Sequence, residues 1–111
     1  MIGKESVQRD ILKALINDYR ACGNQTLSIT SSVKSLTIPE NARYAFIQVE
    51  STNTSDALRY WVDGSYPTAS TGIVRGNLDC FDIVEAQNLV GFKVIAGTGG
   101  GTTHINVQYY K

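Results

Sequence analysis

The chain has 111 residues, the size of a single domain. Ten Lys and Arg balance ten Asp and Glu, so the formal net charge is zero. This excludes a nucleic-acid binder that relies on phosphate contacts, because such a protein needs a basic surplus. Hydrophobic residues make up 42% of the chain and charged residues 18%, which excludes an acidic disordered tail and is enough for a core.

The start of the chain and the cysteines bear on its compartment. The first ten residues, MIGKESVQRD, contain no apolar h-region, and no apolar run of about 18 residues occurs. We therefore expect no secretory signal, no membrane span and synthesis in a cytoplasm. Cys22 and Cys80 could form at most one bridge, so we expect two reduced thiols.

Residues 4–20 have the pattern of an amphipathic helix, with apolar side chains on one broad face at 100° per residue. Gly23 follows where a helix C-cap belongs, so residues 1–23 are predicted to be a helical arm. The apolar face consists of Val7, Ile11, Leu12, Ala14, Leu15, Ile16 and Tyr19.

This apolar face is wider than one sheet contact requires, which leaves two interpretations. The helix either covers an open end of the following sheets or packs on a partner chain. In the second case, two helices side by side would form a dimer seam. The residues of that seam would be Ile11, Leu12, Leu15 and Ile16.

After Gly23 the sequence becomes rich in Thr, Val, Ile, Tyr and Ser, with turn signals every eight to twelve residues. About eight short antiparallel strands in residues 24–111 predict a mainly β domain, an antiparallel β-sandwich of the jelly-roll type. The predicted strands are 25–31, 33–38, 42–50, 57–62, 73–76, 79–85, 91–96 and 102–110.

Two of these strands have informative patterns. Residues 42–50 are apolar on both faces, so this strand should be central in its sheet. Residues 102–110 alternate, which places Thr103 and Ile105 on a buried face and His104 and Tyr110 on the opposite face.

The sequence offers no recognisable catalytic site. His104 is the only histidine and lies in the middle of a predicted strand, and no serine or cysteine lies in a nucleophile motif. One His and two Cys are too few for a typical zinc site. We therefore expect no enzymatic activity, no cofactor and no metal.

Two polar motifs have simpler interpretations. Asp79 and Asp82 would point to opposite faces of a strand, which indicates a solvated strand end, with calcium binding as the alternative. The glycine-rich segment 97–102, GTGGGT, precedes a strand rather than a helix, so it predicts a hairpin loop and not a phosphate-binding loop.

The aromatic residues are the best candidates for a binding surface. Alternation along residues 57–62 separates Leu58 and Tyr60 from Arg59 and Trp61. If Leu58 and Tyr60 are in the core, Trp61 is exposed beside Arg59; the alternative is a buried Trp61. Exposed aromatic and Arg side chains are typical anchors of protein interfaces, and aromatic rings also stack on sugars. The interface candidates of the β domain are Arg59, Trp61, Tyr66 and Tyr110.

Residues 38–111 resemble a known family. The similarity lies in Leu58–Gly64 (LRYWVDG), Tyr66–Gly72 (YPTASTG), Phe81–Glu85, Gly91–Ala96 and the closing Ile105–Lys111. These segments resemble the capsid decoration, or staple, proteins of tailed bacteriophages, in particular the epsilon-fifteen group of short-tailed Salmonella phages.

The resemblance implies a jelly-roll protein without catalytic activity. Such a protein binds the outer surface of an icosahedral capsid and stabilises contacts between major capsid proteins. From it we expect a virion protein, made in the bacterial cytoplasm, that binds the major capsid protein. The possible helical seam makes us expect homo-oligomers as well, with a dimer favoured. A carbohydrate-binding module is the alternative, with Tyr60, Trp61 or Tyr66 stacking on a host glycan.

Overall fold

The computed structural model describes residues 19–111. Most of the amphipathic helix predicted for residues 4–20, its part up to residue 18, lies outside the described residues. The same holds for its interface candidates, Ile11, Leu12, Leu15 and Ile16.

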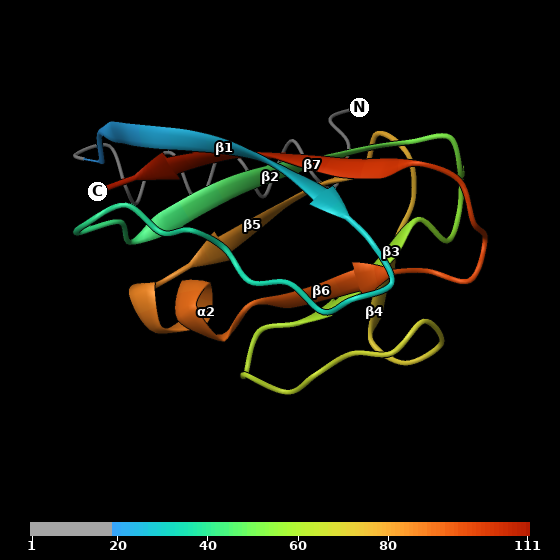
Figure 1. The fold of residues 1–111 in the computed structure, drawn as a ribbon. Helices are drawn as coiled ribbons and strands as arrows, with labels where there is room; N and C mark the ends of the chain where they lie inside the picture. The colour runs from blue at the N-terminus through green and yellow to red at the C-terminus, as the bar shows by residue number, and fades with distance from the viewer. Residues whose placement is uncertain (1–18) are drawn as a thin grey trace, which may run out of the picture.

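The described chain folds into two antiparallel β-sheets that face each other (Figure 1). Sheet A has the order β1-β7-β2-β5, and sheet B has the order β4-β3-β6. Sheet A consists of β1 (Ala21–Ile29), β7 (Thr103–Tyr110), β2 (Tyr44–Ser51) and β5 (Cys80–Val84). Sheet B consists of β4 (Ile73–Arg75), β3 (Leu58–Trp61) and β6 (Lys93–Ala96). The mainly β prediction is confirmed, with seven strands in place of about eight.

The core lies between the sheets and follows the alternation of the strands. In β7, Thr103, Ile105, Val107 and Tyr109 are buried and the residues between them are half-buried, as predicted. An aromatic stack joins the sheets: the Tyr60 ring of β3 lies parallel to the Phe81 ring of β5, with centroids 4.7 Å apart. Burying each such side chain stabilises the fold by about 1.5–3 kcal/mol.

β2 lies in the interior of sheet A, between β7 and β5, which confirms the prediction of a central strand. Ala45, Ile47 and Val49 point into the core and are fully buried. Tyr44 is also buried, although it belongs to the opposite face of the strand.

The strand predicted for residues 33–38 is wrong, because only Lys34 forms a β-bridge, to Val94 of β6. Further along the segment, the backbone N–H of Thr37 donates to the side-chain oxygen of Gln25 at 3.1 Å. A side chain of β1 thus replaces the backbone partner that a continued strand would need.

The region after β5 contains a helix that the sequence pattern did not predict, α2 (Ala86–Gly91). It has only six residues and no side-chain N-cap, so neither periodicity nor a capping motif marks it. Leu89 anchors it in the core. The strand predicted for 91–96 accordingly begins at Lys93.

Two glycine predictions were wrong. Gly23 does not end a helix but lies in β1, where the register with β7 shifts between Ala21 and Gly23. The β domain therefore begins before the predicted boundary at residue 24. The segment 97–102 is not a hairpin loop, because it connects β6 of sheet B to β7 of sheet A.

Candidate functional site

β3 divides its side chains between the core and the outer face of sheet B. Leu58 and Tyr60 are buried, whereas Arg59 and Trp61 point outward and are half-buried. Trp61 is therefore on the outer face beside Arg59, but neighbouring groups cover part of its ring. Tyr60 stacks on Phe81 in the core, so the prediction that Tyr60 could stack on a sugar is wrong.

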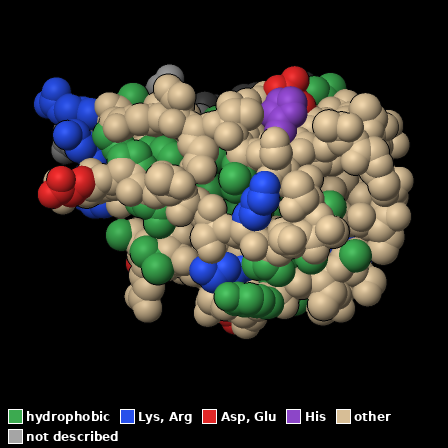
Figure 2. Space-filling view, viewed as in Figure 1, with side chains coloured by type: hydrophobic (Ala, Val, Ile, Leu, Met, Phe, Trp, Pro, Cys, Tyr) green, Lys and Arg blue, Asp and Glu red, His purple; other side chains and the backbone are tan. Residues whose placement is uncertain are grey.

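Neighbouring strands extend this outer surface on both sides of β3. Arg59 pairs with Val74 of β4 and with Ile95 of β6, and Trp61 pairs with Lys93 of β6. We call these five residues the Trp61 face. In Figure 2, basic and hydrophobic side chains lie next to one another in the lower half of the view, on the side of sheet B.

Sequence reasoning missed the outer members of this face. Alternation within the predicted strand 91–96 separates Lys93 and Ile95 from the buried Val94, so the sequence pattern did indicate that Lys93 and Ile95 share an outward face. This pattern did not say which strand pairs with β3, and only this pairing brings Lys93 beside Trp61.

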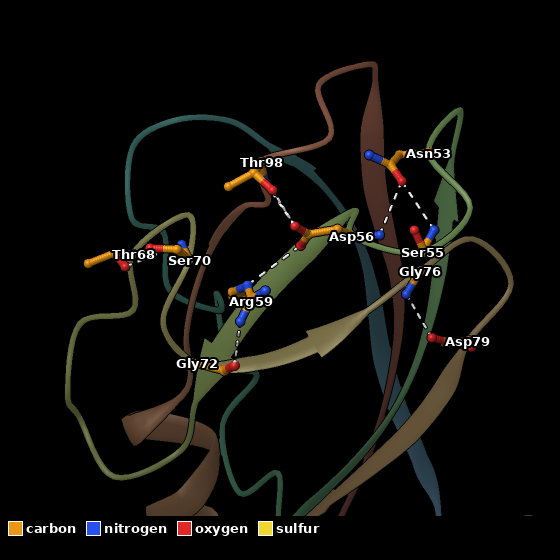
Figure 3. A network of polar contacts seen from close by, with 10 residues as sticks. All are labelled: Asn53, Ser55, Asp56, Arg59, Thr68, Ser70, Gly72, Gly76, Asp79 and Thr98. Carbon is orange, nitrogen blue, oxygen red and sulfur yellow. Dashed lines mark hydrogen bonds and ion pairs between the residues drawn. The ribbon is translucent and has the colours of Figure 1, made fainter.

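Arg59 is fixed by partners at the end of the sandwich (Figure 3). Its Nε lies 3.5 Å from Asp56 Oδ1, and its Nη1 donates to the carbonyl oxygen of Gly72 at 3.3 Å. Gly72 packs closely on β3, because an added Cβ would lie 3.2 Å from the Arg59 Cβ. The guanidinium thus ties the β3–β4 connection to the strand.

Asp56 also holds the segment between β6 and β7. Its Oδ2 accepts hydrogen bonds from the hydroxyl and the backbone N–H of Thr98. The Thr98 hydroxyl is the main reason why the pKa of Asp56 is lowered; the Thr98 N–H and Arg59 act in the same direction. The carboxylate is therefore ionised at neutral pH and offsets the charge of Arg59.

The remaining polar contacts in Figure 3 close neighbouring turns. The side-chain oxygen of Asn53 accepts from the backbone N–H groups of Ser55 and Asp56, both at 3.1 Å. Asp79 Oδ2 accepts from the N–H of Gly76 at 2.7 Å. These contacts order the loops at this end.

The other two interface candidates lie in different places. Tyr66 belongs to the connection between β3 and β4 and is 71% exposed. Tyr110 lies on sheet A, where its ring centroid is 5.0 Å from that of Tyr44. The structure thus brings Arg59 and Trp61 together and places Tyr110 on the other sheet.

One part of the outer face of sheet A carries a polar network, whereas Tyr44, Phe46 and Tyr110 lie elsewhere on the same face. Glu50 Oε1 accepts from Asn106 Nδ2 at 2.6 Å and lies 3.1 Å from His104 Nε2. These contacts, the Asn106 amide first, lower the pKa of Glu50. The Thr26 hydroxyl donates to Asn106 Oδ1 at 3.1 Å, so side chains of three strands form one network.

An open groove of about 270 Å³ lies on this same face. Amide side chains dominate its lining, and its aromatic member is Phe46. It is lined by Asn24, Gln25, Thr26, Phe46, Gln48, Asn106, Val107 and Gln108. None of these residues carries a charge, so the groove suits a neutral polar ligand.

The described residues contain no group of three His, Cys, Asp or Glu side chains that could hold a metal ion. Asp79 accepts from Gly76, whereas Asp82 accepts from the Tyr44 hydroxyl in sheet A. Cys22 and Cys80 do not form a disulfide with each other. Within residues 19–111, no helix is long and apolar enough to cross a membrane.

Comparisons of the chain with protein-family models, with curated proteins and with solved structures found no match.

Proposed function

We propose that this protein is a structural component of a phage virion that binds the outer surface of an icosahedral capsid and stabilises contacts between major capsid proteins. It acts through binding and not through catalysis. The support comes from the resemblance of residues 38–111 to capsid decoration proteins and from the Trp61 face. The protein would be made in the bacterial cytoplasm and reside on the capsid exterior.

The arrangement of Arg59 and Trp61 carries this proposal. Aromatic and Arg side chains are the residues that most often dominate the binding energy of protein interfaces. Here β3 holds both on one face, and Asp56 and Gly72 fix the Arg59 side chain before any partner binds. A preformed anchor loses less conformational entropy on binding than a mobile one.

We also propose that the sandwich is a jelly roll. A jelly roll has eight strands in two sheets, and the structure has seven. Lys34 and Val94 exchange backbone hydrogen bonds of 2.8 and 3.0 Å at the edge of β6. Counting the Lys34 segment as a reduced strand gives sheet B the order Lys34-β6-β3-β4 and each sheet four members.

The functional proposal is tested by purifying the phage particles that encode this chain. We expect the protein in purified capsids, and we expect particles made without it to release DNA at a lower temperature. Capsids that contain none of it would contradict the proposal. So would particles whose DNA retention does not depend on it.

The groove on sheet A favours a second candidate function, binding of a neutral oligosaccharide. Asn24 and Gln48 line the groove, and neither side chain makes a hydrogen bond within the described residues. Side-chain amides both donate and accept, which matches the hydroxyl groups of a sugar.

This candidate is tested by NMR titration with neutral oligosaccharides of the host surface. Binding should shift the side-chain amide signals of Asn24 and Gln48, and Gln48→Ala should weaken it. Spectra that do not change at millimolar sugar would contradict this second function and would leave capsid binding unaffected.

A further inference from the structure

The two edges of sheet B differ in how they are covered. At the β6 edge, the backbone of Lys34 pairs with Val94. At the opposite edge, β4 pairs with β3 on one side and with no strand of the described chain on the other. An uncovered edge strand presents unpaired backbone groups that can pair with another strand.

The side chains at the β4 edge do not protect it. Ile73 is 41% exposed and Val74 is 42% exposed, although both are large and apolar. Natural edge strands are commonly protected by an outward-pointing charge or a proline. The charged residue of β4, Arg75, instead lies over the ring of Phe81, with 5.2 Å between its guanidinium carbon and the ring centroid.

A third apolar residue, Leu78, lies in the turn that connects β4 to β5. It is 65% exposed and has a φ of 69°, a left-handed conformation that is unfavourable for a leucine. Its N–H donates to the carbonyl oxygen of Val49 at 2.8 Å, and the N–H of Asn77 donates to Asn53 at 3.2 Å. The hydrogen bonds of this turn therefore hold an apolar side chain in solvent at the cost of backbone strain.

We propose that two copies of this chain pair through β4 in an antiparallel manner. A two-fold axis at Val74 would join the two copies of sheet B into one continuous sheet, and Ile73 and Leu78 of both copies would flank the axis. Such an interface is self-complementary, as a dimer with two-fold symmetry requires.

The charges at this edge favour a second copy over a charged partner. Arg75 is engaged with Phe81, and Asp79 accepts from Gly76 within the turn. Arg59, on the neighbouring strand, is paired with Asp56. A two-fold axis at Val74 would place Arg75 of one copy opposite Ile73 of the other, so the two Arg75 side chains are not directly opposed. The exposed side chains of Ile73, Val74 and Leu78 are apolar, which suits an identical edge better than a charged partner. The pairing does not depend on the proposed capsid binding, but it would place two Trp61 faces on one surface and so increase the avidity for a repeating target.

Sedimentation equilibrium of the full chain tests the pairing. We expect the wild-type protein to pass from monomer to dimer between roughly 1 and 100 µM. Val74→Lys should raise the dimer dissociation constant at least about tenfold, because it places two lysines at the centre of the interface. Val90→Lys is the matched control, because Val90 is 65% exposed on α2, outside β4. A wild-type protein that stays monomeric, or equal effects of the two lysines, would overturn the proposal.

Two further variants separate β4 pairing from other causes. Leu78→Asn should weaken the dimer while keeping or raising the melting temperature, since asparagine tolerates the left-handed conformation better than leucine. Val74→Cys should form an interchain disulfide under oxidation, because directly opposed residues of an antiparallel pair have the Cα spacing that a disulfide needs. Val90→Cys should not. A dimer that is lost in Leu15→Asp but is unchanged in Val74→Lys would overturn the proposal in favour of the predicted helical seam.

Discussion

The outer faces of the two sheets differ in how their side chains are used. On sheet A, polar groups bond to one another across strands, as Glu50, Asn106 and Thr26 do. On sheet B, Arg59, Trp61 and Ile95 form a mainly aromatic and aliphatic surface. The polar contacts of Arg59 are with Asp56 and Gly72, at the margin of this surface. The polar groups of sheet A that are already paired gain little by binding a protein, whereas an aromatic and aliphatic face around a fixed Arg gains buried area.

Replacement of Trp61 should produce the largest effect on binding. We expect Trp61→Ala to weaken capsid binding by at least about 2 kcal/mol, roughly 30-fold, because a central aromatic anchor is removed. The free energy of unfolding should change less, since the side chain points away from the core. Co-sedimentation with capsids and denaturant unfolding measure the two effects.

A matched replacement on the other sheet tests the contrast between the faces. Gln48→Ala removes an outward side chain of β2 and should leave capsid binding unchanged. Equal losses of binding in Gln48→Ala and Trp61→Ala would mean that the two faces do not differ in function.

Alternation alone separated the two faces of β3 and of β7, but for β3 it left open which of the two faces is buried. It did not predict the Trp61 face, because Val74, Arg59 and Ile95 become neighbours only through the strand order of sheet B. Strand order depends on contacts distant in sequence, which local patterns do not encode.

The errors at short elements have a similar origin. The Lys34 segment looks like a strand but loses a backbone partner to the Gln25 side chain. The helix α2 depends on the burial of Leu89 rather than on a helical pattern of its own. In both cases a tertiary contact outweighs the local preference.

Removal of the Asp56 carboxylate should have the next largest effect. Asp56→Ala leaves Arg59 without its ion-pair partner and Thr98 without an acceptor, so we expect a loss of about 1–2 kcal/mol in the free energy of unfolding. Urea unfolding measures it. Thr98→Val should cost less, because Asp56 then keeps Arg59; an equal cost would show that the ion pair contributes nothing.

The same carboxylate should make stability depend on acid pH. The pKa of Asp56 is lower in the folded chain than in the unfolded chain, where it is about 3.9. Its stabilising contribution is therefore complete above the unfolded pKa and is lost as the pH falls through the folded pKa. Thermal unfolding between pH 7 and pH 2 should show a shallower acid decline in Asp56→Asn than in the wild type, and identical declines would contradict this.

The smallest effect is expected on sheet A. Glu50→Gln keeps an acceptor for Asn106 but loses the charge beside His104, and both groups are exposed. The melting temperature should fall by less than in Asp56→Ala. A larger fall would show that the polar network of sheet A, and not the Asp56 contacts, is the main polar support of the fold.

Hydroxyl-radical footprinting of the free and capsid-bound protein tests whether the Trp61 face is the surface that binds the capsid. Trp and Tyr side chains are the reporters, and both sheets carry them. We expect capsid binding to protect Trp61 and to leave Tyr110 of sheet A as reactive as in the free protein. Protection of Tyr110 with no change at Trp61 would contradict this expectation.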